Sequence, residues 1–197
     1  TTNDVLPQQT VWIGVTDDGL VSRTRDEKQP KHSGNDAPRY LVKASTTDTI
    51  YFVSNRGKAA AVAAHLIPEA SKMSQGIAHY KVSPLGDTDT LAAVFSLPAG
   101  KSSLGEETCI ITISRFGMIK KSLVTELPGP SSQTFTMVKV NEGDKLGWVG
   151  VTDGKKKEID PKDEMRLMRA LGLNHNRTER YLRTLVWYGR NSFISSK

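Results

Sequence analysis

The chain has few of the residues that enzymes and metal-binding proteins use for chemistry. It contains a single cysteine, Cys109, which cannot form an internal disulfide or a multi-cysteine metal site, and we expect it to be buried within its apolar run. The four histidines do not have the spacing of a zinc motif, and no Walker-type phosphate loop is present. We therefore expect no catalytic residue, no metal and no cofactor.

Long apolar runs are also missing. No stretch approaches the roughly 18 apolar residues of a membrane helix, and the polar first residues do not resemble a signal peptide. The 197 residues are 37% hydrophobic and 24% charged, as in ordinary globular domains. These features predict a cytoplasmic protein with one sizeable domain and no membrane contact.

The net charge of +6 is unevenly distributed. Residues 160–197 hold eight Lys and Arg against four Asp and Glu, a net of +4, which leaves 19 against 17, or +2, for residues 1–159. A positive excess favours a polyanionic partner. Because the main body is almost neutral, any nucleic-acid contact there requires that its charges be segregated.

What the sequence does contain is a repeat of a short β-branched run, a polar turn with glycine, and a second short run with basic residues. It occurs four times, in residues 11–23, 50–59, 109–121 and 146–157, with turn glycines Gly19, Gly57, Gly117 and Gly154. A glycine with positive φ lets two antiparallel strands reverse tightly, so each copy is predicted to be a β-hairpin.

The spacing of these glycines predicts the architecture. The intervals are 38, 60 and 37 residues, close on average to the ~45 residues of a four-stranded propeller blade. The sequence therefore predicts a mainly β, propeller-like fold of about four units. Residues 24–38 and 100–107 are rich in Gly, Ser, Pro and charged residues and are predicted to be exposed loops.

The pattern changes near residue 160. Residues 164–171 have helical periodicity ended by Gly172, and a second helix is predicted to follow Asn176. We expect a β-repeat domain over residues 5–159 and a helical basic tail over residues 160–197. Residues 169–182 also resemble a helix-turn-helix, and a pair of helices docking on the β domain is an alternative for the same segment.

Two features of the repeat resemble a known family. Residues 15–24 and 113–121 look like the repeated hairpin of the C-terminal domain of bacterial gyrase A and topoisomerase IV A subunits, and residues 141–146, Asn-Glu-Gly-Asp-Lys-Leu, resemble that family's link between blades. The resemblance covers roughly residues 5–159. It implies a β-pinwheel that bends or wraps duplex DNA beside a catalytic domain located elsewhere. The family's gyrase-specific heptapeptide has a degraded counterpart in residues 29–35, which departs from the pattern of strong wrapping.

Basic residues recur near the turn glycines and in the tail. In a radial arrangement, equivalent positions fall on one rim, where the charges would follow DNA phosphates. The alternative is a set of solvated strand ends that prevent aggregation. The predicted DNA-binding residues are Arg23, Arg25, Lys28, Lys31, Arg56, Lys58, Arg115, Lys120, Lys121, Lys155, Lys156, Lys157, Arg177 and Arg180.

Taken together, these features predict a non-catalytic domain that binds and bends duplex DNA. The resemblance implies that it presents this DNA to the catalytic domain and partner subunit of a type II topoisomerase, in the cytoplasm and associated with the nucleoid. Two alternatives follow from the same residues. One is a propeller-like scaffold for protein partners that uses loops 24–38 and 100–107, and the other is a regulator whose tail reads DNA sequence.

Overall fold

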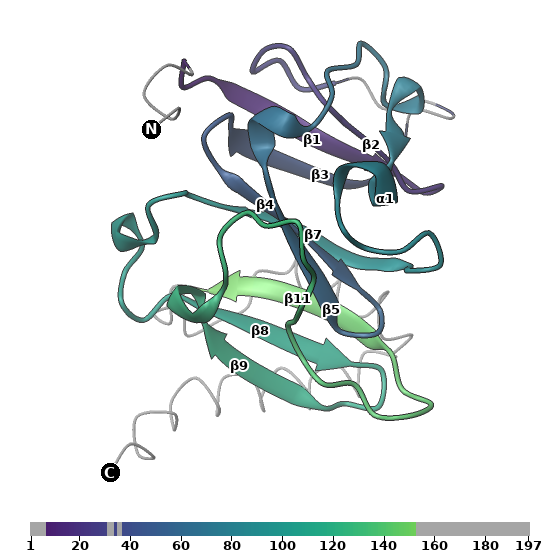
Figure 1. Cartoon of the computed structure of the whole chain (residues 1–197), viewed down its shortest axis with the longest axis vertical. Helices are drawn as coiled ribbons and strands as arrows, with labels where there is room; N and C mark the ends of the chain where they lie inside the picture. Colours follow the sequence, from purple (N-terminus) through teal and green to yellow (C-terminus); the bar gives the residue numbers. More distant parts are fainter. Residues whose placement is uncertain (1–6, 31–33, 35–36, 153–197) are drawn as a thin grey trace. The chain divides into compact units, whose positions relative to one another are not determined.

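The computed structural model describes residues 7–30, 34 and 37–152, which form three antiparallel sheets with short helical turns between them (Figure 1). The predicted mainly β class is confirmed. The chain divides into two compact units: the first contains residues 1–103 and 127–139, and the second contains residues 104–126 and 140–197. The predicted boundary near residue 160 and the helical tail lie outside the described residues.

The first sheet belongs to the first unit. Its order is β3 (Pro38–Ser45), β1 (Thr10–Thr16), β2 (Leu20–Arg23) and β6 (Ile77–Ala78). The alternation of Val11, Ile13 and Val15 places all three side chains on one face of β1, where they are buried. The hairpin predicted in residues 11–23 is thereby confirmed as β1 and β2.

The second sheet also belongs to the first unit. Its order is β10 (Phe135–Thr136), β5 (Lys58–Ala63), β4 (Thr49–Ser54) and β7 (Leu91–Leu97). Every residue of β4 is buried, because both faces of this sheet are covered. On one face, Tyr51 stacks on Phe95 with ring centroids 5.1 Å apart, and its hydroxyl donates to the carbonyl of Pro128 at 2.7 Å. The predicted hairpin over residues 50–59 is confirmed as β4 and β5.

The third sheet belongs to the second unit. Its order is β11 (Leu146–Thr152), β8 (Cys109–Ser114) and β9 (Ile119–Leu123). β8 and β9 are the predicted third hairpin, and Cys109 is buried as expected. The fourth predicted copy begins with β11, which pairs with β8 as the third strand of this sheet. The remainder of that copy, with Gly154, lies outside the described residues.

All three sheets follow one plan. A central strand, β1, β4 or β8, pairs on one side with its hairpin partner and on the other with a later strand, β3, β7 or β11. The later strand skips one residue at the same point each time, opposite the last two residues of the central strand. The skipped residues are Arg39, Ala92 and Gly147. This recurring β-bulge shows that the three sheets are structural repeats.

The fourth strands come from non-local segments. β6 pairs with β2 but follows the second hairpin in the chain, and β10 pairs with β5 but follows the third hairpin. Each of these sheets is therefore completed by a segment that follows the next hairpin.

Short helical turns connect the strands. Those in the described part of the chain are four 3₁₀ helices and one α-helical turn, α1; the bounds are Ala64–Leu66, Met73–Gln75, Lys101–Ser103, Val124–Glu126 and, for α1, His79–Val82. The turns after β5 and β9 are fastened in the same way, because the first N–H of each donates to the carbonyl of the residue that precedes the central strand. These bonds run from Ala64 to Asp48 at 2.9 Å and from Val124 to Thr108 at 3.2 Å. The first predicted loop is present where it is described, since the residues from Arg25 to Gln29 are exposed and lie outside any strand. The second, residues 100–107, contains the 3₁₀ helix Lys101–Ser103.

The first unit has one continuous apolar core between its two sheets. It includes Val11, Ile13, Ile50 and Phe52, which are completely buried. The two sheets are also joined by a hydrogen bond from the Tyr40 hydroxyl to the Leu91 carbonyl at 3.1 Å. Trp12 and Trp148 are only partly buried and do not belong to this core. The Trp12 indole N–H instead donates to the Glu27 carbonyl at 2.9 Å.

Candidate nucleic-acid interface

Each hairpin ends in the same four-residue turn, over residues 16–19, 54–57 and 114–117. The N–H of the closing glycine donates to the carbonyl of the first residue at 3.0 Å in all three turns. Gly19, Gly57 and Gly117 have φ angles of 77°, 82° and 87°, where an L-residue is strained. The turn backbone is therefore constant, and the side chains in and beside the turn give each tip its chemistry.

A carboxylate fastens the third tip. Asp144 is 9% exposed, and its Oδ1 accepts hydrogen bonds from the N–H of Phe116 at 3.1 Å and of Lys145 at 2.7 Å. The carbonyl of Lys145 accepts from the N–H of Arg115 at 2.8 Å. The inter-blade link that resembles the family motif thus has a structural function, which is to hold the backbone of this hairpin tip.

The second tip is held at the same point. The N–H of Asn55 donates to the carbonyl of Thr90 at 2.8 Å, as Arg115 does to Lys145. Asp89 therefore occupies the position that Asp144 has at the third tip. The N–H of each aspartate donates to the carbonyl of the residue three before it, Gly86 or Asn141, at 3.1 Å. The Oδ2 atom of Asp89 accepts from the N–H of Gly86 at 2.9 Å.

The three tips carry different charges. Asp17 and Asp18 are exposed at the first tip, Arg56 with Lys58 at the second, and Arg115 at the third. At the first tip, Nη1 of Arg39 lies 3.5 Å from Oδ1 of Asp17, so the negative charge of Asp17 is partly compensated. Because carboxylates repel phosphate, only the second and third tips are suited to a polyanion.

The third hairpin also has opposite charges at its two ends. Arg115 lies at the tip, Lys120 and Lys121 follow it on β9, and Lys145 lies in the link bound to the tip. The acidic residues of the other end are Glu106 and Glu107, which precede β8, and Glu126, which follows β9. The charges are only partly segregated, because Asp144 binds the Phe116 N–H and Glu142 belongs to the same link as Lys145.

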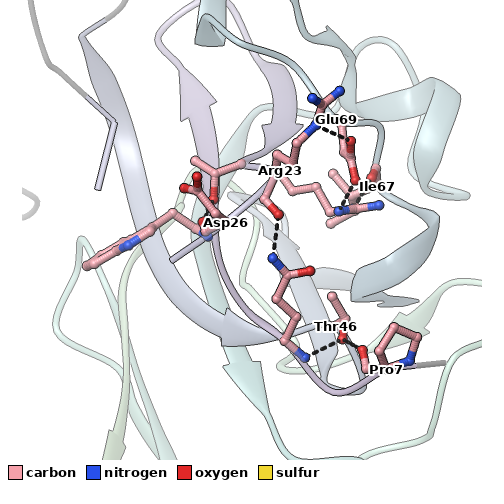
Figure 2. A network of polar contacts seen from close by, with 10 residues as sticks. Pro7, Arg23, Asp26, Thr46, Ile67 and Glu69 are labelled. Atoms are coloured by element: carbon pink, nitrogen blue, oxygen red, sulfur yellow. Dashed lines mark hydrogen bonds and ion pairs between the residues drawn. The ribbon is translucent and has the colours of Figure 1, made fainter. Parts of the chain in front are cut away.

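Arg23 is directed away from the tips. It pairs with Ile13 at the far end of the first hairpin, and its side chain is only 15% exposed. Its Nε donates to the Ile67 carbonyl at 2.9 Å, and its Nη1 lies 2.8 Å from Glu69 Oε1 (Figure 2). These contacts give Arg23 an internal structural role and leave it little surface for a phosphate.

Comparisons with known proteins agree with this geometry. No family model matches the chain. The DNA gyrase A subunit of Klebsiella oxytoca is 28% identical over 181 residues, which are 86% of this chain and 19% of that protein. The gyrase A subunit of Salmonella typhimurium is 32% identical over 132 residues, which are 67% of this chain and 14% of that protein.

Solved structures give the same answer for the fold. The C-terminal domain of a DNA topoisomerase IV matches with a TM-score of 0.62 and 19% identity, covering 76% of this chain and 48% of that one. The E. coli ParC C-terminal domain matches with a TM-score of 0.59 and 15% identity, covering 73% and 56%. The chain belongs to the gyrase A and topoisomerase IV C-terminal domain family. Its fold is therefore the β-pinwheel, as predicted. The chain spans about a fifth or less of the length of these gyrase relatives.

The remaining predicted contact residues of this pinwheel domain can be placed one by one. Arg25, with 88% of its side chain exposed, and Lys28 lie in the loop after β2, where Arg25 Nε is 3.5 Å from Glu69. Lys120 is exposed and Lys121 is partly buried. The other predicted contacts, Lys31, Lys155, Lys156, Lys157, Arg177 and Arg180, lie outside the described residues.

Lys145 is a candidate contact that was not predicted from the sequence. This residue lies within the family-like link, and only the backbone hydrogen bond to Arg115 brings it to the third tip. Lys101 is a different case: its ammonium group donates to the Leu127 carbonyl, and burial lowers its pKa. It is therefore a structural cation of the first unit.

Other kinds of site find little support in the described part of this pinwheel. No group of three or more His, Cys, Asp or Glu residues there could hold a metal ion, and no helix there is long and apolar enough to cross a membrane. One open cavity of about 330 Å³ lies beside the loop after β2, lined by Arg25, Asp26, Lys28 and Glu69 among others. Its mixed charges do not select an anion.

Proposed function

We propose that this domain binds and bends duplex DNA through the hairpin tips of the second and third sheets. The observation that carries the proposal is that exposed cations, Arg56, Lys58 and Arg115, lie at these tips on a pinwheel of the gyrase A family. On β9, Lys120 is also exposed and Lys121 is partly buried. Of the fourteen residues predicted from the sequence, Arg56, Lys58, Arg115, Lys120 and Lys121 form the part of the interface that we retain among the described residues.

The chemistry of such an interface is electrostatic. Each phosphate neutralised by Lys or Arg releases condensed counterions, so the affinity falls steeply with salt. Strands and turns that present cations to the backbone do not read base edges, so binding should tolerate many sequences. Bending is what the resemblance to the gyrase A family implies, and contacts of this kind favour DNA that deforms easily.

The domain itself is proposed to be non-catalytic. Strand breakage and rejoining would belong to the catalytic domain of the topoisomerase, to which this domain would deliver DNA, with the partner subunit completing the enzyme. Its place of action would be the cytoplasm, on the nucleoid. The predicted tail over residues 160–197 remains a proposed basic appendage of this domain.

A direct test is ligation of nicked plasmid in the presence of the 197-residue chain, followed by measurement of the linking-number distribution. A protein-dependent shift is expected, because bent or wrapped DNA stores writhe when the nick is sealed. Unchanged linking number, together with no binding to duplex at low salt, would reject the proposal and favour a protein-interaction scaffold.

Charge variants locate the interface. Replacing Arg56 and Lys58 with Gln should weaken duplex binding and reduce the slope of log affinity against log salt by up to about two, at ~0.9 per lost phosphate contact. The matched control is Asp17→Asn with Asp18→Asn at the equivalent first tip. This control removes two charges of opposite sign and should not weaken binding.

A further inference from the structure

The third hairpin tip exposes two apolar side chains that the fold does not use. Phe116 is 71% exposed and Met118 is 60% exposed, on either side of Gly117. The equivalent positions hold Asp18 and Leu20 at the first tip and Arg56 and Lys58 at the second. Since the same turn forms there without an aromatic residue, the turn geometry does not require Phe116.

The backbone below these side chains is firmly held. Ser114 accepts from Gly117 N–H through its carbonyl at 3.0 Å and from Met118 N–H through its hydroxyl at 3.1 Å. Asp144 accepts from the N–H of Phe116 at 3.1 Å. A rigid tip presents an apolar group without losing much conformational entropy on binding, which is the property of a preorganised contact.

Cations supply the exposed charge in contact with this tip, above the buried carboxylate of Asp144. Arg115 precedes Phe116 directly and is exposed, and Lys145 is bound through its backbone to Arg115. An aromatic and a thioether side chain between cations match a DNA duplex, in which apolar base faces lie between two lines of phosphates. Phe and Met are among the side chains that proteins insert between base steps to kink DNA.

We infer that Phe116, supported by Met118, is an apolar wedge that inserts partly between two base pairs where DNA meets the third tip. This inference rests on the proposed DNA-binding function and adds the way in which bending is produced. Arg115 and Lys145 would contact the phosphates beside the wedged step, while Phe116 unstacks it. The wedge would favour flexible pyrimidine–purine steps, because these unstack most readily.

The test compares Phe116→Ala, Phe116→Leu and the wild-type full chain on two short duplexes. One carries a donor and an acceptor dye at its ends to report bending, and the other carries 2-aminopurine to report unstacking. Phe116→Ala should lower the affinity about tenfold, the order of magnitude of losing one base–aromatic stack. It should also reduce the bend and the 2-aminopurine fluorescence rise. Phe116→Leu should retain most of the bend, because leucine also serves as a wedge.

Two controls separate the possible failures. Leu66→Ala removes another apolar side chain of similar exposure, 64%, in the first unit, and should leave every DNA signal unchanged. Arg115→Gln should reduce the salt slope, whereas Phe116→Ala should not, since it removes no charge. If the wild type binds duplex with a normal salt slope but Phe116→Ala equals it in affinity and bend, the wedge is rejected while DNA binding stands. If the wild type does not bind duplex, the proposed function itself fails.

Discussion

The carboxylate of Asp144 gives the sharpest test of how the third tip is held. Replacing it with alanine removes the acceptor of two N–H groups, those of Phe116 at 3.1 Å and Lys145 at 2.7 Å. A hydrogen bond to a charged group contributes about 1.5–3 kcal/mol. Because both donors become accessible to water when the tip opens, we take the lower end of this range for each of the two hydrogen bonds and expect a total loss of about 3 kcal/mol.

Amide hydrogen exchange measures this loss where it occurs. About 3 kcal/mol corresponds to a roughly 140-fold rise in the exchange rate of the Phe116 and Lys145 amides, at tenfold for every 1.4 kcal/mol. Asp144→Asn keeps one carbonyl oxygen without the charge. At ~1 kcal/mol for each of two neutral hydrogen bonds it retains about 2 of the roughly 3 kcal/mol, so we expect a smaller rise of about fivefold. The Gly57 amide, at the second tip, is the internal control and should exchange at an unchanged rate in both variants. Equal exchange of the Phe116 amide in wild type and Asp144→Ala would refute the account of the link.

Three further predictions concern turn strain and buried ionisable groups. Gly117→Ala should lower the unfolding free energy by about 1–2 kcal/mol, measured by urea titration, because φ is 87° there, and an unchanged midpoint would contradict the turn assignment. Burial raises the pKa of Tyr51 to about 12, so its phenol should stay neutral in the folded protein as the pH rises past 10. An unfolded tyrosine ionises near pH 10, so the unfolding free energy should fall above about that pH, and less so in Tyr51→Phe. Burial lowers the pKa of His79 below its usual 6.5, opposed by the nearby Asp89, so the unfolded state takes up the proton first and stability should fall as the pH drops below 6.5. His79→Gln should flatten that dependence in thermal unfolding, and an equal slope in both proteins would show that another group is responsible.

Local sequence patterns were enough to predict the hairpins. Each needs only an apolar strand, a polar pair and a glycine able to adopt positive φ, all within about a dozen residues. Gly19, Gly57 and Gly117 were therefore identified correctly, and the similarity of the repeats led to the correct family. The link at residues 141–146 was also recognised, although its function in holding the third tip could not be derived from the sequence.

The pairing of distant strands was decided by the tertiary structure. β6 and β10 have two residues each, which is too short for any periodic signal, and each joins a sheet whose hairpin lies far back in the chain. The strand at Leu146 illustrates the same limit: its local pattern fits a hairpin strand, and only the structure shows that it also pairs with the distant strand β8.

Arg23 marks the corresponding limit for function. By its position after a turn glycine it belongs with the other basic residues, yet Glu69 and the Ile67 carbonyl, more than forty residues away, hold its side chain. The sequence alone determined the repeat, the turns and the family, because those depend on neighbouring residues. Which cations remain exposed, and that Phe116 stands among them, was decided only by the folded chain, because burial and ion pairing depend on residues that meet only after folding.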